Sequence, residues 1–203
     1  MQGLLIRKWK NIYMKKDYIL NWLKDNLTEE RYEHTLGTAE CARLLAEMFG
    51  ENPDKAEFAG LLHDAAKCHP TEKLLEIIKE KLPEIPECEL LNYKTYHAPV
   101  GAYIAQNEFQ VQDEEIINAI KYHTLGRVDM TKFEMIIFIA DKIEARTRDK
   151  ANNDRIWAII KEKGLKPAMF ILFSDTIKSL VQRKLPICPT TIDVYNNLIE
   201  FAP

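Results

Sequence analysis

The sequence predicts an all-α fold, and three of its features carry this prediction. The 203 residues include only 7 glycines, and no run alternates apolar and polar residues between turn signals, as a half-buried strand would. Apolar residues instead recur three and four positions apart, which is the spacing of one buried helix face. Residues that begin and end helices also recur along the chain. We therefore expect a single domain over residues 1–203, built as a helical bundle.

Capping residues predict where the helices of the first half begin and end. Residues 1–27 are expected to form an N-terminal helix or an extension. Three further helices are predicted to begin after Thr28, Asn52 and Thr71. Gly50 would end the first of them, because glycine adopts the left-handed conformation that closes a helix without strain. The second is expected to carry the adjacent pair His63 and Asp64, and the prolines at 83 and 86 end the third.

The second half of the chain continues in the same way. Helices are predicted over residues 97–109, 114–124, 135–145 and 168–184, and a last short helix follows Pro189. Asp113 is the expected cap of the helix at 114. Thr131 and Glu134 have the spacing of a capping box, in which each side chain binds the backbone of the other. Residues 155–203 are thus expected to form the C-terminal helices of the bundle.

Composition excludes several classes of partner and compartment. The chain has 28 basic and 31 acidic residues and a net charge of −3, so nothing electrostatic favours binding to nucleic acid or to a membrane. No apolar stretch has the length of a signal peptide or a membrane span. The four cysteines are widely spaced and form no CxxC pair, which favours reduced thiols over a disulfide framework or a zinc knuckle. We expect a cytoplasmic protein.

Four of the five histidines lie on the apolar stripe of a predicted helix: His34, His63, His97 and His123. One histidine in such a place is more often a hydrogen-bonded core residue than a metal ligand. Small residues lie near three of the four along the same faces, which would let the helices approach closely. Four inward-facing imidazoles in one small domain favour a common site.

Two aspartates are in an equally unusual context. Asp141 follows five consecutive apolar residues, 136–140, and Asp64 follows His63 at the end of another apolar run. An unpaired buried carboxylate costs several kcal/mol or loses its charge, so a cation is expected beside each. Adjacent helical residues project about 100° apart, so His63 and Asp64 can both reach one ion. Imidazoles and carboxylates without thiolates favour iron, manganese or a similar divalent metal over a closed zinc site.

The order of these residues resembles that of the HD-domain metal-dependent phosphohydrolases, which have a separated His, an adjacent His-Asp pair and a distal Asp on a helical bundle. The likeness is closer to one group, the YqeK-type HD proteins. Its motifs are "RYEHTLGTAECARLLAE", "AGLLHDAAK", "HAPVGAYIA" and "YHTLGRVDMTKFEMIIFIADKIEAR", within about residues 31–148. Those proteins are bacterial hydrolases that cleave diadenosine tetraphosphate symmetrically into two ADP. The resemblance thus implies a dinucleoside polyphosphate or a nucleotide as partner and an ADP- or GDP-like product.

The resemblance also implies roles for individual residues. The main metal, which is iron in that family, would be held by His34, His63, Asp64 and Asp141. His97 and His123 match histidines that bind a second metal in other HD proteins or contact phosphate, so one ion or two remain open. The family pattern has an arginine three residues after a glutamate that corresponds to Glu144. Here that position is flanked by Arg146 and Arg148, and either of them is a candidate for the nucleotide contact.

The chemistry implied is hydrolysis of a phosphoanhydride by a metal-activated water. Lys67, one turn beyond His63, is placed to neutralise phosphate charge. His97 or His123 is placed to give a proton to the leaving oxygen, since imidazole titrates near ~6.5. Thr124 and Arg127 are further candidate phosphate contacts, although a helix end with a solvated arginine explains them equally well.

Two other functions remain open from the sequence. The first is another HD activity, such as a nucleotidase or a nucleoside-triphosphate hydrolase; the Gly-Tyr-Pro signature usual in cyclic-dinucleotide phosphodiesterases is absent. The second is a non-catalytic helical module that binds nucleotide or metal for regulation. The sequence also leaves open the base preference and the oligomeric state, with a homodimer as one alternative.

Overall fold

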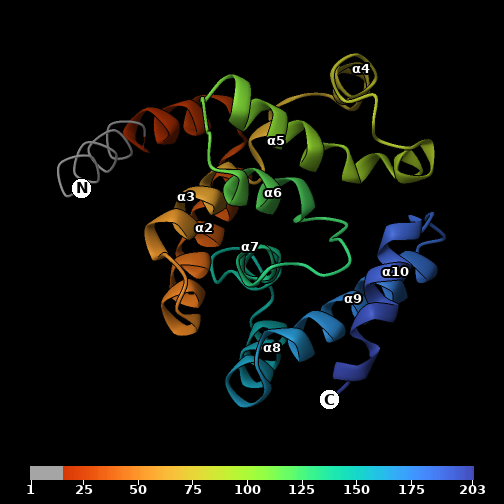
Figure 1. Cartoon of the computed structure of the whole chain (residues 1–203). Coiled ribbons are helices and arrows are strands. Elements are labelled where there is room, and N and C mark those ends of the chain that lie inside the picture. The colour runs from red at the N-terminus through yellow and green to blue at the C-terminus, as the bar shows by residue number, and fades with distance from the viewer. Residues whose placement is uncertain (1–15) are drawn as a thin grey trace.

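The computed structural model of the protein describes residues 16–203, and these form an assembly of helices (Figure 1). The chain is helical over residues 16–26, and no strand is found in this described part. The helices that follow are α2 (Glu29–Phe49), α3 (Pro53–Leu62), η1 (Ala65–Cys68), α4 (Thr71–Lys81), η2 (Glu87–Leu90), η3 (Tyr93–Thr95), α5 (His97–Asn107), α6 (Glu114–Tyr122), α7 (Lys132–Ile143), α8 (Lys150–Lys163), α9 (Leu165–Gln182), α10 (Pro189–Leu198) and η4 (Ile199–Phe201). The prediction of an all-α fold is confirmed.

The predicted caps form where the sequence indicated. Thr28 accepts a hydrogen bond from the backbone N–H of Arg31, at 3.3 Å, and Asn52 and Asp113 cap α3 and α6 in the same way. Thr131 and Glu134 form the complete capping box at the start of α7. Gly50 ends α2 with φ 73°, a conformation that costs a residue with a side chain about 1–2 kcal/mol.

Several helix boundaries differ from the predictions by up to three residues, and two of them bear on the argument. Helix α3 ends at Leu62, and Asp64 has left the α-helical conformation with φ −106° and ψ 13°, so the His63–Asp64 pair does not lie within a continuous helix. Helix α9 begins at Leu165, directly after Gly164, which has φ 91° and separates it from α8. Part of the expected N-terminal helix or extension, residues 1–15, lies outside the described residues, and the single-domain organisation over 1–203 stays a prediction.

Helix α7 occupies the centre of the assembly. Figure 1 shows it nearly end-on, with α2 and α3 on one side and α8, α9 and α10 on the other. It contacts α2, α3, α6, α8 and α9. Its residues from Phe133 to Asp141 are all buried, which confirms the prediction that this helix is enclosed almost all the way round. The structure thereby carries Asp141 into the interior.

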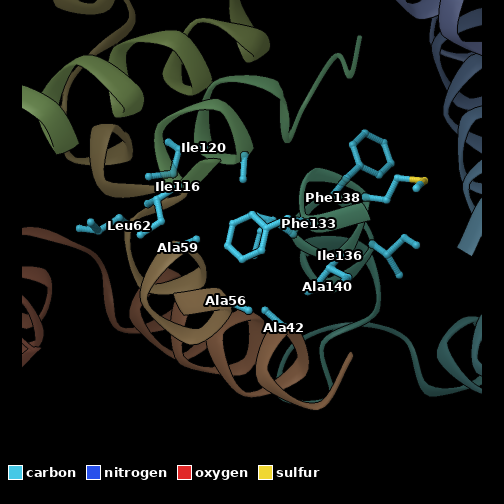
Figure 2. Close-up of a cluster of buried hydrophobic side chains, with 14 of the residues drawn as sticks. Ala42, Ala56, Ala59, Leu62, Ile116, Ile120, Phe133, Ile136, Phe138 and Ala140 are labelled. Atoms are coloured by element: carbon cyan, nitrogen blue, oxygen red, sulfur yellow. The ribbon is translucent and has the colours of Figure 1, made fainter. Parts of the chain in front are cut away.

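The core around α7 is made of interlocking large and small side chains. In Figure 2 the ring of Phe133 points from α7 toward the alanines of α3 and Ile116 of α6, while Phe138 points to the other side of α7. There it stacks on Phe173 of α9, with ring centroids 4.8 Å apart. Truncating a buried phenylalanine to alanine typically costs about 3–5 kcal/mol, so these contacts hold α7 firmly between the two halves.

Helices α2 and α3 lie unusually close because Gly60 faces α2 without a side chain. A Cβ built on Gly60 would lie 2.7 Å from the Cα of Ala39, where ordinary carbon contacts need roughly 3.5–4.0 Å. The predicted close approach of these helices is thus confirmed. It brings His34 of α2 and His63 of α3 within reach of each other. Among the described helices none is long and apolar enough to span a membrane.

Candidate metal centre

Six polar residues from five helical segments meet in the interior of the bundle. His34 comes from the second turn of α2, His63 caps the C-terminus of α3, His97 begins α5, His123 caps the C-terminus of α6, and Asp141 lies in the last turn of α7. Asp64 is the residue next to His63. Each of the six residues is at most 5% exposed, so the surroundings exclude most water.

The first group of potential ligands consists of His34, His63 and Asp141. Nε2 of His34 lies 3.0 Å from Oδ1 of Asp141 and 3.3 Å from Nε2 of His63. Their ligand atoms all lie within 4.8 Å of one another. Two imidazole nitrogens and a carboxylate oxygen at such distances could bind one divalent cation.

Asp64 lies between this group and a second pair of histidines. Its Oδ2 faces the first group, 3.7 Å from Nε2 of His34 and 3.6 Å from Nε2 of His63. Its Oδ1 faces the second pair, 3.2 Å from Nε2 of His97 and 3.7 Å from Nε2 of His123. One carboxylate therefore connects all four predicted histidines, and each of its oxygens has a different set of neighbours.

Backbone and carboxylate acceptors determine which ring nitrogen of each histidine carries its hydrogen. Nδ1 of His63 lies 2.7 Å from the carbonyl oxygen of Gly60, and Nδ1 of His123 lies 2.7 Å from that of Ile120. A carbonyl only accepts, so each Nδ1 donates and each Nε2 keeps its lone pair. Nδ1 of His34 donates likewise to Glu144, at 3.2 Å. Outer partners of this kind orient metal-binding histidines in many proteins.

The resulting set of donor atoms fits a cation. With Nδ1 of both rings donating outward, the Nε2 lone pairs of His34 and His63 face Oδ1 of Asp141 and Oδ2 of Asp64, and such a cluster of lone pairs attracts positive charge. Burial lowers the pKa of His63 to about 4, against the opposing effect of Asp64, and the neutral imidazole is the form that binds metal. Burial would raise the pKa of both aspartates, but the facing histidines and cations hold each well below its usual range.

Basic side chains surround the two aspartates on the outer side. Nη1 of Arg31 donates to Oδ2 of Asp64 at 2.8 Å. Nζ of Lys142 and Nη2 of Arg148 donate to the two oxygens of Asp141 at 2.7 and 2.9 Å. All three basic side chains are partly exposed. They therefore present positive charge both to the carboxylates and to solvent.

Lys67 lies in the same electrostatic environment, half-buried in η1. Burial lowers its pKa, while the negative charges of Asp64 and Asp141 oppose this shift. Thr124 also belongs to the centre, because its hydroxyl lies 3.2 Å from Nε2 of His97. Both residues were predicted as substrate contacts, and the structure brings both close to the predicted ligands.

Two arginines predicted as substrate contacts are bound elsewhere. The guanidinium of Arg127 forms three hydrogen bonds of 3.0–3.2 Å with the buried carboxylate of Glu134. Arg146 binds two glutamates on α2, Glu33 and Glu40. Of the pair around the family position, only Arg148 contacts a residue of the centre.

The sequence analysis missed three residues that contact the centre: Arg31, Lys142 and Glu144. Arg31 lies three residues before His34, and Glu144 three after Asp141, so helical spacing would have placed each on the ligand face. Glu144 is fully buried and also accepts hydrogen bonds from the backbone N–H groups of Arg146 and Thr147. A Cβ on Gly37 would overlap its carboxylate, which explains the glycine at that position of α2.

Comparison with known proteins agrees with this arrangement. Residues 31–146 match the HD domain family. The chain is 40% identical to the symmetrical bis(5'-nucleosyl)-tetraphosphatase of Bacillus subtilis (strain 168), over 92% of this chain and 99% of that protein. It is 36% identical to the protein of the same name from Halalkalibacterium halodurans, over 92% and 98%.

A solved structure agrees as well. The crystal structure of a predicted HD superfamily hydrolase from Clostridium acetobutylicum, described as involved in NAD metabolism, superposes with a TM-score of 0.86 at 36% identity. The match covers 91% of this chain and 97% of that one. The six buried residues described above lie within residues 31–146, the part of the chain that matches the HD domain family. The chain belongs to the HD domain family, in the group that includes the symmetrical bis(5'-nucleosyl)-tetraphosphatases.

Proposed function

We propose that this protein is a metal-dependent hydrolase that cleaves diadenosine tetraphosphate symmetrically into two ADP. The observation that carries the proposal is the pairing of a buried His/Asp centre with partly exposed basic side chains on its outer side. The centre suits a divalent cation, and the basic groups suit a polyphosphate. Relatives of nearly the same length are named for this activity.

The metal ligands proposed are His34, His63, Asp64 and Asp141. A divalent metal held by these residues would supply Lewis-acid charge and would lower the pKa of water toward about 7. Iron is the metal proposed, with manganese as the alternative, because the donor set contains only imidazoles and carboxylates. Glu144 holds His34 in the orientation that presents Nε2.

Four basic residues are proposed to bind the phosphate chain: Arg31, Lys67, Lys142 and Arg148. Three of them already donate hydrogen bonds to the ligand carboxylates, so a phosphate next to the centre would share their hydrogen bonds. Hydrogen bonds between charged groups are about twice as strong as neutral ones. Arg127 and Arg146 would stabilise the surrounding loops, since each is bound to glutamates.

His97 is the proposed hydrogen-bond donor to the leaving phosphate oxygen. Its Nε2 lies 3.0 Å from Nε2 of His123, whose own hydrogen is used at Nδ1. The hydrogen between the two rings therefore belongs to His97. Thr124 lies beside it and would orient the same phosphate group, and a phosphate oxygen bound there would replace Nε2 of His123 as the acceptor of this hydrogen.

Cleavage of diadenosine tetraphosphate in water enriched in heavy oxygen tests the proposal. The expected products are two ADP, one of them labelled, and ATP with AMP would overturn the symmetrical assignment. Asp64→Ala and Asp141→Ala should abolish both metal content, measured by elemental analysis, and cleavage, while circular dichroism stays helical. Asp154→Ala is the matched control, because this carboxylate is exposed and, among the described residues, forms an ion pair with Lys150 alone.

The same assays separate the other functions. A nucleotidase or nucleoside-triphosphate hydrolase would release phosphate or pyrophosphate from mononucleotides faster than it cleaves the dinucleotide. A regulatory module would bind ADP and metal without turnover. Either result would replace the activity proposed here.

A further inference from the structure

We infer that Thr147 is a positioning residue for the metal centre, because its hydroxyl fixes the carboxylate of Glu144 that orients His34. The same hydroxyl stabilises the turn that carries Arg148. The inference rests on the proposed function, because it assumes that His34 binds a metal and that Arg148 contacts phosphate. Thr147 itself would contact neither group. It lies in the turn at residues 145–147, between the end of α7 and the beginning of α8.

The carboxylate of Glu144 is enclosed by hydrogen-bond donors from the residues that follow it. Glu144 is fully buried and comes directly after Ile143, the last residue of α7. Its Oε2 accepts from the backbone N–H of Arg146 at 2.6 Å, and both of its oxygens lie 3.1 Å from the backbone N of Thr147. The turn is therefore built around this one side chain.

Thr147 and His34 donate to the same oxygen of this carboxylate. The hydroxyl of Thr147 donates to Oε1 of Glu144, which lies 3.2 Å from Nδ1 of His34. One carboxylate oxygen can accept both bonds, because it has two lone pairs. Hydrogen bonds to an ionised carboxylate are about twice as strong as neutral ones. Loss of the hydroxyl would therefore free Oε1 to move, and the imidazole of His34 would lose its fixed direction.

Arg148 directly follows Thr147, so the turn also determines where a proposed phosphate contact lies. Nε of Arg148 donates to the carbonyl oxygen of Asp141, and Nη2 donates to Oδ1 of the same residue, both at 2.9 Å. The turn thus contacts two proposed metal ligands, since Glu144 binds His34. The guanidinium is a rigid, planar donor, so a shift of the backbone at residue 147 would misdirect it. Metal affinity and phosphate affinity should therefore both depend on the hydroxyl.

Both ends of the turn are anchored by bonds that do not involve Thr147. Nδ2 of Asn153, on α8, donates to the carbonyl oxygen of Glu144 at 2.9 Å. Asp149 caps α8 by accepting from the backbone N–H of Asn152 at 2.8 Å. A protein without the hydroxyl should therefore still fold, and the effect of the substitution should be confined to the turn and to the two ligands that it contacts.

Thr147→Val and Thr147→Ser test the inference, because valine keeps the shape of threonine without the hydroxyl and serine keeps the hydroxyl. Competition with a chromophoric chelator should show metal bound about tenfold more weakly by Thr147→Val and within about twofold of the wild type by Thr147→Ser. Calorimetry on the metal-saturated protein should show inorganic tripolyphosphate bound about threefold more weakly by Thr147→Val alone. Thr176→Val is the matched control: its hydroxyl donates to the carbonyl oxygen of Leu172 within α9, so both affinities should stay unchanged.

Two results would overturn the inference. One is wild-type metal affinity in Thr147→Val, even with a lowered Tm, because a purely structural role would change stability alone. The other is an equal loss of metal affinity in Thr147→Val and Thr147→Ser, which would mean that the hydroxyl is not the group responsible. Absence of diadenosine tetraphosphate cleavage by the wild type would refute the proposed function instead. The chelator competition, which involves no cleavage, would still decide whether Thr147 positions the metal ligands.

Discussion

Replacing Gly60 with alanine should impair metal binding more than it impairs folding. The added Cβ would lie 2.7 Å from the Cα and 3.0 Å from the N of Ala39, both backbone atoms of α2. Ordinary contact needs roughly 3.5–4.0 Å, so α2 and α3 would have to separate by about 1 Å. Metal–ligand distances are held within roughly 0.2 Å. The separation between His34 and His63 would therefore exceed that tolerance several-fold.

The cost to stability should be moderate. Overpacking costs about 1–3 kcal/mol, and alanine returns about 0.5–1 kcal/mol in a helix interior. The net loss of about 1–2 kcal/mol would lower the Tm by roughly 2–8 °C in a chain of this size. Competition with a chromophoric chelator should show metal affinity reduced more than tenfold. Gly50→Ala is the control: its Cβ would meet nothing within 4 Å, so it should lower the Tm through backbone strain and leave metal affinity intact. Wild-type metal affinity in Gly60→Ala would refute the argument.

Three further outcomes follow from other contacts. Glu144→Gln should weaken metal binding about 10- to 100-fold, because the amide is a weaker acceptor for the Nδ1 hydrogen of His34. Competition with a chelator measures the metal affinity, and an unchanged affinity would contradict the role of Glu144 in orienting His34. Arg148→Met should raise the KM for diadenosine tetraphosphate at least tenfold, whereas Arg146→Met, which removes only partly exposed ion pairs, should lower stability by at most about 1 kcal/mol and leave the KM unchanged. A raised KM in Arg146→Met and an unchanged KM in Arg148→Met would mean that Arg146, and not Arg148, contacts the substrate. Cys88, the exposed cysteine, should be alkylated in the native protein before the two buried cysteines, because burial raises the pKa of Cys41 to about 12. Peptide mass mapping measures the order of labelling, and early labelling of Cys41 would contradict its burial.

Local features made most helix boundaries predictable. The caps at Thr28, Asn52 and Asp113 depend on hydrogen bonds within three residues, which a sequence contains in full. The end of α3 was not predictable in this way. No breaker residue follows Leu62, and the change of conformation at Asp64 occurs where the chain packs beneath α5. Contacts between segments distant in sequence decide such a boundary.

The six buried histidines and aspartates could be predicted from their context in the sequence, whereas the basic residues Arg31 and Lys142 beside them were missed. A histidine or aspartate on an apolar helix face violates the usual pattern, so all six buried residues stood out. Arg31 could have been found only through its helical spacing from His34, and Lys142 occupies a half-exposed position where a basic residue is ordinary. The contacts in three dimensions reveal which arginines bind the centre and which bind glutamates elsewhere.

The small residues around the His63–Asp64 pair explain how one carboxylate serves both groups of histidines. If α3 continued unchanged through Asp64, its side chain would project about 100° away from His63 along the helix surface. The helix instead ends, and Ala65 and Ala66 begin a tight turn in which both are fully buried. Helix α5 lies close to this turn, because a Cβ on its Gly101 would meet the carbonyl oxygen of His63 at 3.3 Å and the Cβ of Ala66 at 3.9 Å. The turn directs the two oxygens of Asp64 to opposite sides. The alanines and glycines of this region therefore determine the geometry of the metal centre as directly as the ligands do.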